Sequence, residues 1–124
     1  MPARGGQSFP AAARLKSSRE YSRLWRDGER CHTRNLTIIA AKPPVPHPAG
    51  SRLGTTVSRK VGNAVCRNRL KRWLREYFRS HKARLTGIAD ISVIAKPGAA
   101  HLTHAAFDQE LQEALRRLRL YVDA

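Results

Sequence analysis

Acidic residues are scarce in this chain of 124 residues, where nine Asp and Glu stand against 24 Lys and Arg. The net charge of +15 and the pI near 11.4 are typical of proteins that bind a polyanion. Nucleic acid is the partner that this charge favours, and an anionic membrane surface is the weaker alternative. The hydrophobic content of 41% and the length fit one folded domain.

Cysteines and long apolar runs are also scarce. Cys66 falls on the apolar stripe of a predicted helix and no secretory leader is recognisable, so we do not expect a disulfide with Cys31. The longest apolar run, Ile38 to Ala41, is far shorter than the roughly 20 residues that span a bilayer. The stretch from Met1 to Arg14 has no hydrophobic signal-peptide core. We therefore expect a cytoplasmic protein without a membrane partner.

The few acids are scattered, which argues against a nuclease that works alone. Such an enzyme needs clustered carboxylates for metal ions or a histidine pair with a nucleophile. His101, His104 and Asp108 have helical spacing, but the helix should begin between the two histidines, so we interpret them as ordinary polar residues. The sequence predicts no catalytic residue, no metal site, no cofactor held by the protein alone and no small-molecule substrate.

The cations concentrate between Ser58 and Arg79, where a helix is predicted to start after Gly62 and Asn63 and to continue to about Ser80. Its apolar stripe consists of Cys66, Leu70, Trp73, Leu74 and Tyr77. The opposite side carries Asn68, Arg72, Arg75 and Arg79. An ordinary solvated helix mixes charges of both signs, whereas acids at i+4 are almost missing here. This pattern favours binding to phosphates.

A capping box of Ser17 and Glu20 predicts an earlier helix from about Ser18 to Asp27. Tyr21 and Trp25 share one face of this helix among several arginines. Two interpretations remain open: the rings pack in the core, or they stack on unpaired bases.

Three strands are predicted, from Thr33 to Lys42, Arg52 to Ser58 and Asp90 to Lys96. A last helix, capped by Thr103, should run to about Leu118. The order α-β-β-α-β-α predicts an α+β fold, a two-layer α/β sandwich with helices on one side of a small sheet. We expect a single RNA-binding domain over residues 14–120, a flexible N-terminal tail over 1–13 and a C-terminal tail over 121–124.

The string KVGNAVCRNRLKRWLRE, residues 60–76, closely resembles the signature of the bacterial ribonuclease P protein component, including its central Arg-Asn-Arg. The resemblance extends through RLKSSREYSRLWRDG, LGTTVSRK and ADISVIAKP and so covers about Arg14 to Leu118.

This resemblance implies the protein subunit of a bacterial ribonucleoprotein endonuclease that removes the 5′ leader from precursor tRNA. In that family a large RNA is the catalyst and uses Mg²⁺. The implied partners are this catalytic RNA and precursor tRNA, and the implied fold has an unusual left-handed β-α-β crossover. The alternative is a non-enzymatic RNA-binding module, such as a ribosomal protein of similar fold.

Carried over by residue, the resemblance implies two RNA-binding surfaces. The surface for the catalytic RNA comprises Arg59, Lys60, Asn63, Arg67, Asn68, Arg69, Lys71, Arg72 and Arg75. A separate cleft for the 5′ leader comprises Tyr21, Trp25 and Arg34. Some relatives place aromatic residues where this chain has Leu36 and Ile39, so base stacking is not expected from that strand.

Overall fold

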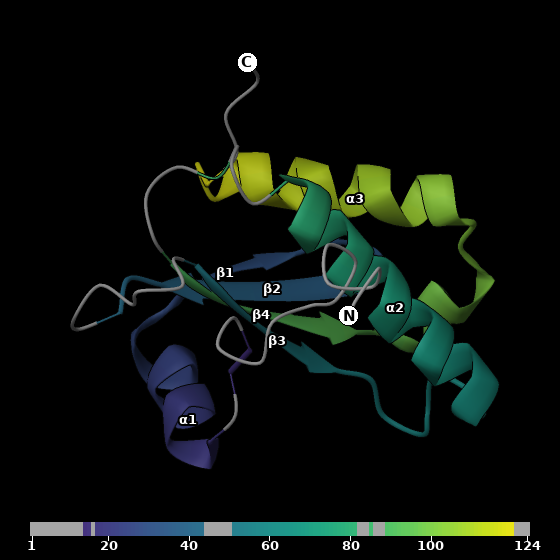
Figure 1. Ribbon diagram of the computed structural model, residues 1–124, viewed down its shortest axis with the longest axis horizontal. Coiled ribbons are helices and arrows are strands. Elements are labelled where there is room, and N and C mark those ends of the chain that lie inside the picture. The colour runs from purple at the N-terminus through teal and green to yellow at the C-terminus, as the bar shows by residue number, and fades with distance from the viewer. Residues whose placement is uncertain (1–13, 16, 44–50, 82–84, 86–88, 121–124) are drawn as a thin grey trace, which may run out of the picture.

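A mixed sheet of four strands, with helices on both sides, forms the protein in the computed structural model (Figure 1), which describes residues 14–15, 17–43, 51–81, 85 and 89–120. The predicted tails, residues 1–13 and 121–124, lie outside the described residues. In chain order the elements are α1 (Ser18–Asp27), β1 (Glu29–His32), β2 (Leu36–Ala41), β3 (Arg52–Thr56), α2 (Ala64–His81), β4 (Asp90–Ala95), the 3₁₀-helix η4 (Pro97–His101) and α3 (His104–Arg117).

The strands lie in the order β1-β2-β4-β3. Both β1 with β2 and β2 with β4 pair antiparallel, whereas β3 pairs with β4 in parallel. Parallel strands need a crossover connection, and α2 lies within it. This β3-α2-β4 unit is the one to which the family resemblance assigns the left-handed crossover.

The two faces of the sheet have different coverings (Figure 1). Helices α2 and α3 pack on one face, which we call the covered face, and bury residues such as Leu36, Ile38 and Ile91. Helix α1 packs on the other face, the α1 face, where Leu24 contacts Ile39. The main core therefore lies between the sheet and the helix pair.

The predicted α+β sandwich is confirmed, but one further strand is present, the strand predicted from Thr33 begins at Leu36, and one helix lies on another face than expected. Strand β1 was not predicted, because its sequence ERCH lacks an apolar pattern and it becomes a strand through pairing with β2. Helix α1 lies on the face opposite to α2 and α3 rather than on the same side. No helix among the described residues is long and apolar enough to cross a membrane.

Candidate nucleic-acid interface

Asn63 caps the basic helix α2, as predicted, because its Oδ1 accepts a hydrogen bond of 2.9 Å from the backbone N–H of Cys66. The predicted apolar stripe is confirmed at four positions, to which the structure adds Phe78. The buried side chains are Leu70, Trp73, Leu74, Tyr77 and Phe78. Burial of this side fixes which cations point away from the core.

Five of the nine predicted RNA-binding residues are exposed, and they lie on α2 or on the loop before it. They are Arg59, Lys60, Asn63, Asn68 and Arg72. Arg67, Lys71 and Arg75 follow at i, i+4 and i+8, so they share one half-buried flank of α2. The Nε of Arg67 also donates to the carbonyl oxygen of Gly62 at 3.2 Å.

Arg69 lies on the other flank of α2 and is engaged within the protein. Its Nη2 donates to the carbonyl oxygen of Ala100 in η4 at 3.3 Å. Its guanidinium lies 5.3 Å from the ring centroid of Trp73, which stacks on His104 with centroids 4.8 Å apart. Arg69 therefore helps to pack α2 against η4 and α3, so it differs from the outward cations.

His104 also lies near two carboxylates, 3.6 Å from Asp108 and 3.9 Å from Glu76. Burial raises the pKa of Asp108, while the nearby His104 and His81 oppose this rise. Thr103 caps α3 between His101 and His104, as predicted. Within the described ranges, no three His, Cys, Asp or Glu residues form a group that could hold a metal ion.

The two aromatic residues of α1 have different environments. Trp25 is 50% exposed, which excludes the core interpretation for this ring. Tyr21 is half-buried, and its ring lies so close to Gly54 that a side chain there would collide with it. Burial raises the pKa of Tyr21, and a hydrogen bond with the backbone of Thr55 partly offsets the rise.

A cavity of about 170 Å³ joins the two predicted surfaces. Its walls include Tyr21 of α1, Gly54 and Thr55 of β3, and Arg75 of α2. Arg14 lines the same cavity, and the backbone N–H of the next residue, Leu15, donates to the Leu53 carbonyl at 2.9 Å. A phenol ring and two guanidinium groups thus line one cavity at the edge of the sheet.

A buried ion-pair network fixes α1 on the sheet. Asp90 is fully buried and accepts hydrogen bonds from Arg23 of α1 and from Arg52 of β3. Arg52 also pairs with Glu20 of α1. The hydrogen bond with Asp90 is the main cause that raises the pKa of Arg52, whereas its desolvation acts in the opposite direction.

Arg34, the third predicted leader-binding residue, is exposed in the turn between β1 and β2. Glu110 of α3 holds this turn by accepting hydrogen bonds from Thr33 and from both the backbone and the side chain of Asn35. The turn lies at the opposite end of β1 from α1, so the structure does not bring Arg34 beside Trp25.

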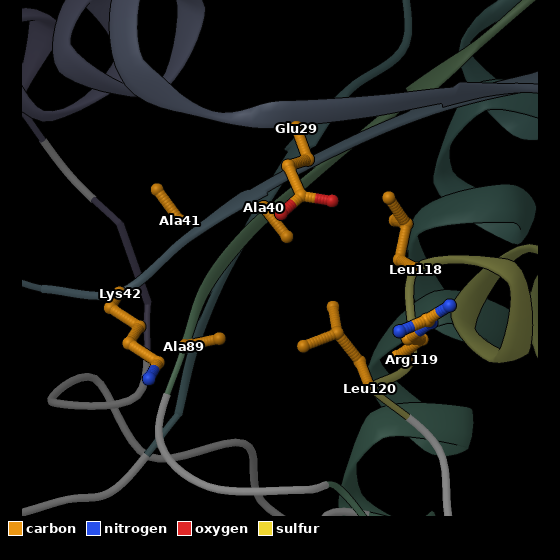
Figure 2. A pocket seen from close by; sticks show the side chains of 8 residues that line it. All are labelled: Glu29, Ala40, Ala41, Lys42, Ala89, Leu118, Arg119 and Leu120. Atoms are coloured by element: carbon orange, nitrogen blue, oxygen red, sulfur yellow. The ribbon is translucent and has the colours of Figure 1, made fainter.

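Another cavity, of about 310 Å³, lies elsewhere, and the residues that line it include none of the predicted site residues (Figure 2). Its walls are mainly apolar, as at Ala40 and Leu120, and Glu29 adds a carboxylate. Arg119, with φ of 60°, forms the turn that carries Leu120 over the sheet. Lys42 and Arg119 add two cations, so the lining combines charges of both signs with an apolar wall.

Sequence reasoning did not identify Arg30 and His32 as candidate site residues. Both belong to β1, at the border of the α1 face. Arg30 pairs in register with Ile39, and His32 pairs with Thr37 and hydrogen-bonds its hydroxyl at 3.1 Å. Because paired residues in a sheet point to the same side, both belong to the α1 face. Only recognition of β1 as a strand could have placed them there.

Comparison with known proteins gives a consistent result. A profile of the family described as Ribonuclease P matches residues 9–119. The ribonuclease P protein component of Geobacter sp. (strain M21) is 39% identical over 112 residues, covering 90% of this chain and 93% of the relative. That of Desulfatibacillum aliphaticivorans is 44% identical over 92 residues, covering 74% and 75% of the two chains.

Solved structures agree with this similarity. The RNase P protein of Staphylococcus aureus superposes with a TM-score of 0.81 at 30% identity, covering 89% of this chain and 98% of that chain. The RNase P protein of Thermotoga maritima superposes with a TM-score of 0.74 at 28% identity, covering 90% and 98%.

Proposed function

The chain belongs to the ribonuclease P protein family, and from this premise we propose how its surfaces serve the removal of the 5′ leader from precursor tRNA. As a protein component of ribonuclease P it has ribonuclease P RNA as its partner and acts in tRNA processing. We propose that α2 contacts the catalytic RNA and that the α1 face, together with the cavity beside it, binds the leader of precursor tRNA.

The observation that carries the first assignment is the charge of α2. Its outward side and one flank present Arg67, Asn68, Lys71, Arg72 and Arg75. Glu76 is the only acid in the helix. These cations repel one another in the free protein, and phosphates relieve that repulsion. The protein thereby lowers the repulsion between two polyanions, the catalytic RNA and its substrate.

The leader assignment is supported by the cavity that Tyr21 and Arg75 share and by the exposed ring of Trp25. Aromatic rings beside a positive groove are the common means of binding single-stranded RNA, because every base has a face that can stack. The shared cavity makes the two RNA surfaces adjacent.

We propose that catalysis belongs to the RNA subunit, and two acids in the described part of the chain are already engaged by protein groups. Asp90 is held between two arginines, and Glu110 is held by Thr33 and Asn35. We propose that Mg²⁺ is used by the RNA-containing holoenzyme and that this holoenzyme acts in the bacterial cytoplasm. A ribosomal protein is not favoured, since the matched relatives are ribonuclease P protein components.

A matched pair of arginines tests the α2 assignment. Arg72 and Arg117 are both exposed and both pair with a glutamate one helical turn away, Glu76 and Glu113. Arg72→Ala should weaken binding to the catalytic RNA and lower the slope of log affinity against log salt by about 0.7 to 0.9. Arg117→Ala, on α3, should leave the slope unchanged. Binding curves at several salt concentrations measure both, and equal slopes for the two variants would remove Arg72 from the interface.

A further inference from the structure

Trp25 is held from one side by an arginine of the neighbouring strand. The guanidinium carbon of Arg30 lies 4.7 Å from the centroid of the indole ring. The same guanidinium donates a hydrogen bond through Nη2 to the carbonyl oxygen of Trp25. Arg30 thus contacts both the ring and the backbone of one residue, which restricts the rotation of the indole.

The stacking leaves much of the indole accessible, since Trp25 is 50% exposed and is one of two exposed large hydrophobic residues among those described. A single exposed apolar residue is common on protein surfaces, so the ordered contact with Arg30, and not the exposure by itself, distinguishes this ring. A cation against one face of the indole and a half-accessible residue leave room for a base on the other face, which is the arrangement that a stacked base requires.

The strand register directs Arg30 toward the α1 face. Arg30 is paired with Ile39, which packs beneath α1 with Leu24. His32 is the next residue of β1 on the same side. The Arg30 guanidinium therefore lies at the border of the face to which we assign the leader, and its positive charge favours a phosphate backbone there.

We propose that Arg30 is a positioning residue that makes Trp25 a preformed stacking platform for one unpaired nucleobase. This inference rests on the proposed function, because it takes the leader of precursor tRNA as the RNA that supplies the base. The guanidinium holds one face of the indole, and the base stacks on the other face. A ring that is already oriented loses less conformational freedom on binding, and so it binds the base more tightly.

Leader-dependent binding by the reconstituted holoenzyme tests the proposal, with precursor tRNA carrying a long leader compared with leaderless tRNA. Trp25→Leu should weaken binding of the long-leader substrate on the order of fivefold to tenfold and should hardly affect leaderless tRNA. Arg30→Gln should weaken the same substrate by about twofold to fivefold. Arg30→Lys keeps the charge but not the planar stack, and it should resemble Arg30→Gln.

Arg26→Gln is the matched control, because Arg26 is an exposed arginine next to Trp25 in α1 and pairs with the carboxylate of Asp27. It should leave the difference between the two substrates unchanged. In the double variant with Trp25→Leu, Arg30→Gln should add little further loss, since a positioning residue has no effect once its ring is gone.

Iodide quenching of tryptophan fluorescence gives a readout that does not depend on affinity. Trp73 is 8% exposed, so the quenchable emission comes mainly from Trp25. A long leader should protect this emission in the wild-type holoenzyme, and it should protect the Arg30→Gln protein less at equal occupancy. Equal protection in the two proteins contradicts a positioning role.

The outcomes separate this inference from the proposed function. If Trp25→Leu affects both substrates equally, the leader assignment of the α1 face fails. If Trp25→Leu shows a leader-specific loss and Arg30→Gln shows none, the leader assignment stands and the role of Arg30 is overturned. If Arg30→Gln tightens leader binding, Arg30 competes with the base for the ring, and the proposal is likewise overturned.

Discussion

The covered face and the α1 face of the sheet are built from different side chains. On the covered face, Ile38, Ile91 and Val93 join residues of α2 and α3 in one large apolar cluster. On the α1 face, the buried cluster among the described residues consists of Leu15, Leu24 and Ile39, and polar groups such as Asp90, Ser92 and Thr37 lie beside them. Apolar burial therefore dominates on one face, while the other combines a small cluster with ion pairs and leaves an aromatic ring accessible.

The largest expected effect compares one leucine from each face. Leu111 and Leu24 are 1% and 0% exposed, but Leu111 lies in the large cluster and Leu24 in the small one. Leu111→Ala should reduce the free energy of unfolding by about 4–5 kcal/mol, because its rigid surroundings cannot fill the cavity, and Leu24→Ala should reduce it by about 2–3 kcal/mol. Urea unfolding measures both, and equal losses would show that the two faces contribute alike.

A second prediction concerns the ion pairs that hold α1. Asp90→Ala leaves Arg23 and Arg52 without their buried partner and should reduce the free energy of unfolding by about 3 kcal/mol. Asp27→Ala, which removes an exposed partner of Arg26, should change it by less than about 0.5 kcal/mol.

The same Asp90→Ala protein should bind long-leader substrate less well, while its affinity for the catalytic RNA should change less, because Asp90 holds α1 and not α2. Thermal melts must be used to choose a temperature at which the variant is folded. A parallel loss on both RNAs would contradict the separation of the two faces.

The smallest expected effect is a pH dependence at the edge of the covered face. Partial burial disfavours the charged form of Glu110, but hydrogen bonds from Thr33 and Asn35 outweigh it and lower its pKa from the ordinary 4.5. A carboxyl group whose pKa is lowered by folding stabilises the protein fully above the unfolded value, and this stabilisation is lost as the pH falls through the folded value.

Thermal melts between pH 7 and pH 3 test whether folding lowers the pKa of Glu110. The midpoint difference between wild type and Glu110→Gln should be constant above about pH 5 and should shrink below the ordinary carboxyl pKa near 4.5. Glu113→Gln, which removes an exposed partner of Arg117, is the control and should show little pH dependence. A Glu110→Gln difference that stays constant to pH 3 would exclude the lowered pKa.

Local signals in the sequence predicted the helices well. The capping box of Ser17 and Glu20 forms with both hydrogen bonds at 3.2 Å, and α1 has the predicted bounds. Thr103 caps α3 as expected. Such caps depend on residues within one helical turn, so their geometry follows from the local sequence.

The strands were predicted less well, because a strand is defined by its partner. β1 is short and lies at the edge of the sheet, and its burial pattern has no fully buried position. The predicted strand from Thr33 begins instead at Leu36, since Thr33 and Asn35 form the turn that Glu110 holds. Neither the pairing of β1 with β2 nor the contact of this turn with Glu110 can be recognised within a short window of sequence.

At the candidate site, too, some features follow from the local sequence and others depend on tertiary packing. The sequence predicted that the cations of α2 share one helix, but only packing shows that Arg69 donates to the Ala100 carbonyl whereas Arg72 is exposed. It left Trp25 open between core and surface, and the structure places it on the surface. An apolar stripe on a helix predicts its inner and outer sides. It does not predict which neighbouring residue contacts a side chain at the border between them.

The sequence by itself determined the positive charge, the scattered distribution of the acids along the chain and the positions at which the helices begin, because composition and caps are local properties. Only the tertiary structure decided that Arg30 stacks on Trp25, that Tyr21 and Arg75 share a cavity and that Asp90 joins Arg23 to Arg52. The cavity and the ion-pair network bring together residues far apart in the chain, and the Arg30 stack depends on an edge strand that the local pattern does not reveal. Their geometry follows from the order of the strands and from the face on which each helix packs.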